Sequence, residues 1–330
     1  MWLRTRRTKT LRIVLFVALA LVASHALAAD RIRIAVQKTG TLAWELEIVR
    51  AYGLDRKADL AIDSIELAST DAGKVALRGG SADLIVSDWL WVARERALGD
   101  DLVFYPYSSA LGAVMVPANS AIKDITDLKG KKLGVAGGPL DKSWLLLQAL
   151  GRKFGIDLAT QTQIEYGAPP LLTQMALLAK TDATLTFWNF CADLEAKGMR
   201  RAVLMSDVMK SLGAKAPIAM IGYVFDDGWA QSNRALLERF FTVTSKAKEI
   251  LAISPGEWQR LASRIGTSDE NALDIYRRRY LEGIPRRPLA DEEADAQVLY
   301  RVLATIGGAD LVGPARTLDP GTFYIAGPSR

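Results

Sequence analysis

The stretch DLIVSDWLWVARER, residues 83–96, places residues that bind organic ligands at the end of an apolar run. The run ends in Ser87, Asp88, Trp89 and Trp91. A carboxylate at such a position accepts hydrogen bonds from an amine or another donor, and tryptophan rings stack on planar or cationic groups. The pattern indicates a binding site. Asp88 also fits the N-cap of the following helix, a role that needs no ligand.

A second stretch, DATLTFWNFCA at 182–192, has the same layout as DLIVSDWLWVA. In this alignment Trp188 falls on Trp89, and Thr186 falls on Ser87. If each turn follows a parallel strand, both turns lie at the sheet edge where open α/β sheets bind ligands. We therefore expect Trp89 and Trp188 to face each other across a cleft. The alternative is that both rings fill the core at the edge of a lobe.

Two glycine-containing turns that open helices are further candidates for binding. In TGT, at 39–41, free N–H groups and the positive end of the helix dipole suit a polar or anionic group, and Trp44 follows one turn later. In AGGPLDKSW, Gly137 and Gly138 allow a ligand to approach the backbone closely, and Asp141 is expected to cap the helix. This stretch lacks the spacing of the dinucleotide and phosphate-loop motifs, so no nucleotide is predicted.

Histidine and cysteine usage excludes several functional classes. The single histidine, His25, lies in the first 28 residues, and the single cysteine is Cys191. Without histidine, the rest of the chain cannot build a histidine-activated nucleophile or a histidine-ligated metal site. Cys191 has no partner for an intramolecular disulfide and is expected to pack as a small apolar residue. We predict no catalytic residue, no metal site and no cofactor.

The first 28 residues are predicted to be a cleavable signal peptide. Basic residues precede the apolar run IVLFVALALVA at 13–23, and small residues at Ala26 and Ala28 suit cleavage after Ala28. The run is shorter than the roughly 20 residues that span a membrane, which disfavours an uncleaved anchor. No cysteine lies near the cleavage position, so a lipoprotein is not expected. We expect a periplasmic protein, exported by either the Sec or the twin-arginine route.

Removal of the signal peptide changes the charge of the chain. The whole chain has 42 Lys and Arg against 37 Asp and Glu, and residues 1–28 contain five basic residues and no acidic one. The remainder therefore has 42 − 5 = 37 basic against 37 acidic residues. This balance gives no indication of nucleic-acid binding.

Short β-rich runs alternate with helical patterns over the first two thirds of the chain, which predicts parallel βαβ units and an α/β fold. Strand patterns cover 31–37, 61–68, 83–87, 131–137, 162–166 and 183–187. Two further extended runs are GAVMVP at 112–117 and APIAMIGYVF at 216–225, and the chain after them is almost wholly helical. This helical tail is either a third domain or a return to the first lobe. The two extended runs would serve as the crossings that a return needs.

Several of these segments together resemble the substrate-binding proteins of ABC importers, most closely the group that binds nitrate, taurine, alkanesulfonates or thiamine-pyrimidine precursors. The segments are the signal peptide, KTGTLAWELEIVRAYGL, VALRGGSADLIVSDWLWVA, IKDITDLKGKKLGVAGG and the closing helical region. The resemblance implies a type II periplasmic-binding-protein fold, in which two α/β lobes joined by two hinge crossings close on a ligand. It implies a first lobe made of 29–112 and 223–330 and a second lobe made of 113–222, after a signal peptide at 1–28.

By motif position, the resemblance implies a set of residues that line the cleft. They are Gly40, Thr41, Trp44, Ser87, Asp88, Trp89, Gly137, Gly138, Trp144, Trp188 and Asn189. Compared with nitrate and sulfonate binders, the sequence is rich in tryptophan and poor in obvious basic cleft residues. We therefore expect a planar or amine-bearing organic ligand rather than an oxyanion.

The resemblance further implies a monomeric receptor without catalytic activity, which delivers a small organic ligand to an ABC permease in the inner membrane. One alternative is an enzyme like those that synthesise the thiamine pyrimidine, but these use a histidine as substrate, and the chain after residue 28 has none. The other alternative is a periplasmic accessory protein of an oxidoreductase system that uses the same fold to bind a protein partner.

Overall fold

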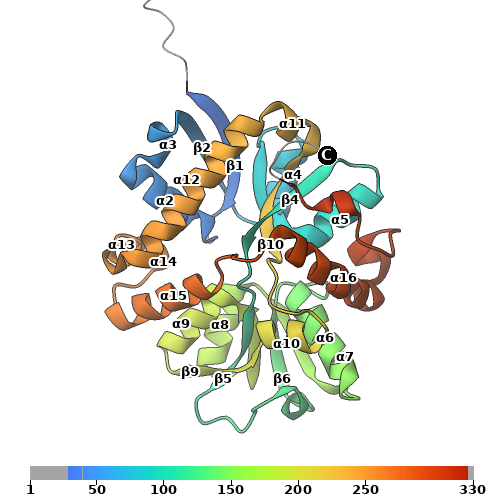
Figure 1. The fold of residues 1–330 in the computed structure, drawn as a ribbon. Helices are drawn as coiled ribbons and strands as arrows, with labels where there is room; N and C mark the ends of the chain where they lie inside the picture. Colours follow the sequence, from blue (N-terminus) through green and yellow to red (C-terminus); the bar gives the residue numbers. More distant parts are fainter. Residues whose placement is uncertain (1–28, 39, 326–330) are drawn as a thin grey trace, which may run out of the picture.

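The computed structural model describes residues 29–38 and 40–325, which form two lobes, each built on a five-stranded mixed sheet flanked by helices (Figure 1). The predicted α/β fold with two lobes is confirmed. The predicted signal peptide lies outside the described residues. Within them, no helix is long and apolar enough to cross a membrane.

The first lobe contains a sheet with the strand order β2-β1-β3-β10-β4. Its strands are β1 (Asp30–Gln37), β2 (Leu60–Leu67), β3 (Leu84–Asp88), β4 (Leu102–Ser108) and β10 (Ile221–Asp226), and its first helices are α2 (Leu42–Tyr52), α3 (Leu54–Lys57), α4 (Thr70–Arg78) and α5 (Trp89–Ala97). Strand β1 pairs in parallel with β2 and β3, whereas β10 pairs antiparallel with β3 and β4. The turns after β1 and β3 therefore lie at one edge of the sheet.

The second lobe has the same layout, with the strand order β7-β6-β8-β5-β9. Its strands are β5 (Gly112–Pro117), β6 (Lys132–Ala136), β7 (Gln163–Gly167), β8 (Ala183–Phe187) and β9 (Met199–Leu204), and its helices are η1 (Ile125–Leu128), α6 (Lys142–Lys153), α7 (Leu158–Gln161), α8 (Pro169–Leu177), α9 (Trp188–Ala196) and α10 (Met205–Ser211). Strand β6 pairs in parallel with β7 and β8, and β5 is antiparallel to β8. Strands β3 and β8 hold equivalent places, which explains the repeated sequence pattern.

Two segments cross between the lobes. Strand β4 leads through 109–111 into β5, and α10 leads through 212–220 into β10. The prediction that GAVMVP is itself a crossing is wrong. This run forms β5, which lies between β8 and β9 in the second sheet. In APIAMIGYVF only the first half crosses, and the second half is β10. The residues at which the lobes begin and end stay a prediction.

The helical tail contacts both lobes. It comprises α11 (Asp227–Ser232), α12 (Arg234–Ile253), α13 (Pro255–Arg260), α14 (Ala262–Ile265), α15 (Glu270–Glu282), α16 (Leu289–Val312) and η2 (Pro320–Thr322). Helix α12 packs on α2, α15 packs on α9, and α16 packs on both α5 and α6 (Figure 1). The tail is therefore not a separate helical domain.

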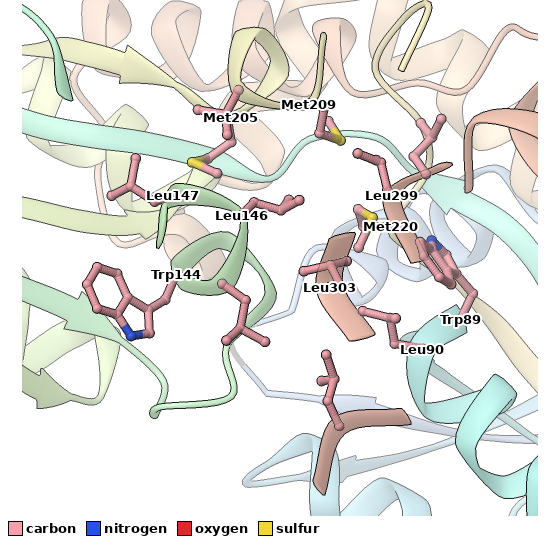
Figure 2. Close-up of a cluster of buried hydrophobic side chains, with 14 of the residues drawn as sticks. Trp89, Leu90, Trp144, Leu146, Leu147, Met205, Met209, Met220, Leu299 and Leu303 are labelled. Carbon is pink, nitrogen blue, oxygen red and sulfur yellow. The ribbon is translucent and has the colours of Figure 1, made fainter. Parts of the chain in front are cut away.

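One apolar core cluster continues from the first lobe through α16 into the second (Figure 2). It includes Trp89 and Leu90 of α5, Leu299 and Leu303 of α16, and Leu146 and Leu147 of α6, all fully buried. Burial of each such side chain contributes about 1.5–3 kcal/mol. This packing favours the arrangement in which α16 holds the two lobes together.

Candidate functional site

The candidate site lies where the turns after β1, β3, β6 and β8 of the two lobes approach each other, and we call it the interlobe site. Two contacts define it: an ion pair between Asp88 and Lys142, and a ring contact between Trp44 and Trp188. Asp88 and Trp44 belong to the first lobe, whereas Lys142 and Trp188 open helices of the second.

Asp88 is both a helix cap and a partner of the opposite lobe. As the last residue of β3 it caps α5, because its Oδ1 accepts a hydrogen bond of 2.9 Å from the backbone N–H of Trp91. Its Oδ2 lies 2.9 Å from Nζ of Lys142. The helix cap predicted from the sequence is confirmed, and the ion pair uses the other carboxylate oxygen. Ligand binding by Asp88 stays a prediction.

The electrostatics of this pair favour the charged forms of both residues. Burial alone would raise the pKa of the Asp88 carboxyl, but Lys142 and the N–H of Trp91 hold it below its ordinary value. Burial would lower the pKa of Lys142, but Asp88 and Asp141 raise it above its ordinary value. Asp141 caps α6, as predicted, through the N–H groups of Ser143 and Trp144 at 2.9 and 3.2 Å.

Aromatic residues from both lobes and the tail form the second interlobe contact. The Trp44 and Trp188 rings meet edge to face, with centroids 5.8 Å apart. Trp258 and Tyr276 pack on Trp44 at 6.1 and 5.9 Å, and Tyr280 packs on Trp188 at 6.1 Å. Both tryptophans are less than a tenth exposed, so in this conformation they contact each other rather than solvent.

The predicted opposition of Trp89 and Trp188 is wrong. Trp89 has no exposed surface and packs against Tyr300 of α16 and Phe323, with centroids 6.4 and 6.5 Å away. The reason is helix α16, which occupies the side of α5 onto which Trp89 projects (Figure 2). Trp144, another predicted ligand residue, is likewise fully buried in the core of the second lobe.

Three buried polar atoms at the strand ends have no hydrogen-bond partner among the described residues: the hydroxyls of Ser87 and Thr186 and the indole Nε1 of Trp89. Ser87 and Thr186 occupy the equivalent positions of β3 and β8 that the sequence alignment paired. An unsatisfied buried group costs about 1–3 kcal/mol, so a hydrogen bond from a water molecule or a ligand would stabilise each of these groups.

The remaining predicted site residues are more accessible. Gly40, Thr41, Gly138 and Asn189 are half-buried, and Gly137 is exposed. Gly137 has a φ of +87°, which favours glycine, and a Cβ there would lie only 3.3 Å from the side chain of Asp141. Both the backbone angle and the close contact therefore favour glycine in this turn. The backbone N–H groups of Gly40 and Gly137 already donate to the carbonyl oxygens of Gln37 and Gly167, at 2.9 and 3.1 Å. A ligand role for these turns stays a prediction.

A buried charged cluster supports the turn at Thr41. Glu45 is fully buried, and its Oε1 accepts from Nζ of Lys248 at 2.5 Å and from the hydroxyl of Tyr280 at 2.6 Å. Nζ of Lys248 also lies 3.9 Å from the centroid of the Tyr107 ring, whose hydroxyl is 3.1 Å from Oγ1 of Thr41. The cavity beside this cluster has a volume of about 10 Å³, room for roughly one water molecule. A ligand of several atoms needs the lobes to separate here.

The sequence interpretation missed Lys142, Glu45 and Lys248. The expectation that the site lacks basic residues is wrong, because Lys142 reaches Asp88 from the opposite lobe. The sequence did offer one signal for Lys142: it directly follows Asp141, the predicted cap residue, and so lies at the start of a helix in one of the predicted binding turns. Glu45 and Lys248 are separated by about 200 residues and no local pattern links them.

The described residues contain no group of three or more His, Cys, Asp or Glu side chains that could hold a metal ion. Cys191 is fully buried, and its Sγ lies 3.3 Å from the carbonyl oxygen of Thr186. Burial raises the pKa of its thiol to about 12. Cys191 is thus a packed residue, as expected from the sequence.

Comparison with known families shows which family this chain belongs to. The sequence model of the family described as NMT1/THI5 like matches residues 56–257, more than half of the chain. The chain belongs to the NMT1/THI5-like family. The matched range includes Ser87, Asp88, Lys142 and Trp188. No curated protein matches the chain.

Solved structures share the fold of this NMT1/THI5-like protein. The periplasmic aliphatic sulphonate binding protein SsuA from Escherichia coli is 21% identical, with a TM-score of 0.68 over 87% of this chain and 95% of that chain. The alkanesulfonate-binding protein SsuA from Xanthomonas axonopodis pv. citri, bound to MOPS, is 18% identical, with a TM-score of 0.68 over 91% and 99%. An ABC transporter protein from Parabacteroides distasonis is 13% identical, with a TM-score of 0.67 over 90% and 99%.

Proposed function

We propose that this protein is a periplasmic solute receptor of an ABC importer, which binds a small organic ligand at the interlobe site and delivers it to a permease in the inner membrane. Three things support the proposal: family membership, a fold shared with sulfonate-binding receptors, and partnerless polar groups at equivalent strand ends of the two lobes. The observation that carries it is the ion pair in which Asp88, a predicted ligand residue, meets a lysine of the opposite lobe.

This pair also indicates the chemistry of the ligand. Removing one partner of a buried ion pair leaves an uncompensated charge, which costs about 3–5 kcal/mol. A ligand that separates Asp88 from Lys142 must therefore supply a donor or cationic group to the carboxylate and an acceptor or anionic group to the ammonium. The hydroxyls of Ser87 and Thr186 provide further hydrogen bonds without breaking any existing one. We propose a polar organic ligand that carries both kinds of group, rather than the purely planar or amine-bearing ligand expected from sequence.

Lobe movement would couple binding to transport. The ligand enters when the Asp88–Lys142 and Trp44–Trp188 contacts are separated, and the lobes then close over it by motion at 109–111 and 212–220. Closure excludes water, which strengthens each polar contact with the ligand. No step requires a covalent change, so we propose binding without catalysis.

Native mass spectrometry of protein purified from periplasm without refolding tests the proposal. We expect the mass of residues 29–330, which reports removal of the signal peptide, together with an added small mass that is lost on denaturation. The control is the Lys142→Met variant, which should lose the added mass while keeping the processed chain. An empty spectrum from the parent, followed by no thermal shift with amines, pyrimidines or sulfonates, would reject the receptor function.

A further inference from the structure

A cavity of about 440 Å³ lies against the strands that lead to the two lobe crossings, and we call it the hinge cavity. Its walls are Tyr105 and Pro106 of β4, Tyr223 of β10, one face of α12, residues 284–287 between α15 and α16, and Leu289 at the start of α16. None of the predicted interlobe residues lines it. Its volume falls in the range of small-molecule sites, roughly 300–1,000 Å³.

One wall of the hinge cavity is aromatic. The rings of Tyr105 and Phe241 stack with centroids 3.9 Å apart and an interplanar angle of 11°, and Tyr223 lies 5.8 Å from Phe241. Stacked rings present a flat apolar surface with a rigid shape, which favours a planar or apolar body in a ligand.

A hydrogen-bond donor in the same wall has no partner. The side chain of Tyr223 is 2% exposed, and its hydroxyl makes no hydrogen bond with any described residue. The neighbouring Thr244 hydroxyl donates to the carbonyl oxygen of Phe241 at 3.1 Å. It also lies close enough to the Tyr223 hydroxyl to oppose part of the rise in its pKa. Burial raises the pKa of Tyr223 well above its ordinary value, so the hydroxyl keeps its proton and remains a donor.

The charges around the hinge cavity leave one cation without a counterion. Lys248 pairs with Glu45, Arg287 pairs with Asp295, and Glu249 pairs with Lys246. Arg286 lines the cavity and makes no hydrogen bond or ion pair within 29–38 and 40–325. Pro285 and Pro288 restrict the backbone on either side of it. A free guanidinium on a restrained segment suits a carboxylate, which it can bind through two parallel hydrogen bonds.

We propose that the hinge cavity is a second ligand site, which binds a small organic anion with a planar body. The carboxylate pairs with Arg286, the body packs on the Tyr105–Phe241 stack, and an acceptor atom takes the free hydrogen bond of Tyr223.

The hinge cavity is connected to the interlobe site by Lys248. This residue lines both the hinge cavity and the small cavity beside Thr41, and it contacts the ring of Tyr107, whose hydroxyl bonds to Thr41. The walls also include the ends of β4 and β10, next to both crossings, and the connection between the two helices that touch the second lobe. An anion in the hinge cavity therefore changes the affinity of the interlobe site, an inference that rests on the proposed receptor function.

Binding of 4-fluorobenzoate, followed by fluorine NMR, tests the second site. Arg286→Gln is expected to weaken binding about tenfold, the effect of losing one charge-assisted contact. Tyr223→Phe removes only an unpaired hydroxyl, so it should weaken binding severalfold without lowering thermal stability. Arg316→Gln, at another exposed arginine without an ion pair among the described residues, is the matched control. Neutral 4-fluorobenzamide should bind more weakly than the benzoate.

Two results would overturn the second site. One is no binding of 4-fluorobenzoate up to about 10 mM. The other is a loss of probe binding in Lys142→Gln but not in Arg286→Gln, which would place the probe at the interlobe site. The coupling has its own test, since the probe's affinity should differ at least threefold between protein carrying its co-purified ligand and protein stripped of it. Equal affinities reject the coupling. Binding of the probe does not depend on whether an interlobe ligand exists, so its failure is distinct from failure of the receptor function.

Discussion

The carboxylate of Asp88 lies 2.9 Å from the ammonium of Lys142, and the two residues belong to opposite lobes. Asp88 is 6% exposed in its side chain and Lys142 is 27% exposed, so the contact is largely shielded from water. The ion pair adds to the packing of α16 in holding the lobes together. In the proposed receptor, a ligand would compete with this pair, which would then contribute to selectivity.

Breaking this pair should open the lobes. We expect Asp88→Asn and Lys142→Met each to increase the radius of gyration measured by small-angle X-ray scattering and to weaken binding of the co-purified ligand. A double-mutant cycle on unfolding free energies should give a coupling of roughly 1–3 kcal/mol, because Asp88 is shielded from water and only Lys142 is partly exposed. Lys210→Met, which removes a lysine from an exposed pair on α10, is the control and should change neither quantity. Additive effects of the two changes would mean that the ion pair does not hold the lobes together.

The two aligned tryptophans should respond differently to substitution. Trp89→Ala removes a fully buried ring from the core around α16 and should lower the free energy of unfolding by about 3–5 kcal/mol. Trp188→Ala loosens the interlobe contact with Trp44 and should weaken ligand binding. Chemical denaturation and a binding titration on both variants separate the effects. A Trp89→Ala protein of parental stability that fails to bind would restore Trp89 as a ligand residue.

The sequence predicted the architecture because its signals are local. Alternating strand and helix patterns indicated the two lobes, and the repeat around Ser87 and Thr186 identified equivalent strand ends. Strand β4 is missing from the prediction; it contains Pro106, which the sheet tolerates because β4 is its edge strand. The sequence could not predict which ring faces Trp188. Trp89 is covered by α16, which begins about 200 residues later in the chain, and no local pattern links the two. Pairing of Asp88 with Lys142 depends likewise on how the lobes dock.

The contribution of the Asp88–Lys142 pair to stability should vary with pH only at the extremes. The pKa of Asp88 is lowered in the folded state, so its contribution is present above the unfolded value of about 3.9 and is lost as the pH falls through the lower folded pKa. The pKa of Lys142 is raised, so its contribution is present below about 10.4 and is lost as the pH rises through the higher folded pKa.

The measurement is the difference in unfolding free energy between the parent and the Asp88→Asn/Lys142→Met double variant, followed against pH. This difference removes the effects of all other titrating groups. We expect it to be constant between about pH 5 and 9 and to change only below about pH 4 or above about pH 10. A transition near neutral pH would show that another group controls the contact.

Cys191 should be unreactive in the folded protein. It is fully buried, and the thiolate that thiol reagents require is scarce because its pKa is raised to about 12. With 5,5′-dithiobis(2-nitrobenzoic acid) at about pH 8, we expect no rapid reaction of the native chain and release of one equivalent of thiolate per chain in denaturant. Rapid reaction of the native chain would mean that the second lobe opens locally around α9.

The entry to the second lobe at Gly112 should not tolerate a side chain. Gly112 has a φ of +131°, and a Cβ there would lie 2.0 Å from the carbonyl oxygen of Thr186, a backbone atom held in the pairing of β5 with β8. Gly112→Ala must therefore shift the first residue after the crossing. Gly80→Ala is the matched control, because Gly80 also has a positive φ, of +67°, but a Cβ there would have no atom within 4 Å. We expect Gly112→Ala to lower the free energy of unfolding by at least about 2 kcal/mol more than Gly80→Ala, measured by urea denaturation. Equal losses in the two variants would show that only the backbone angle matters at Gly112, and that the crossing has room to adjust.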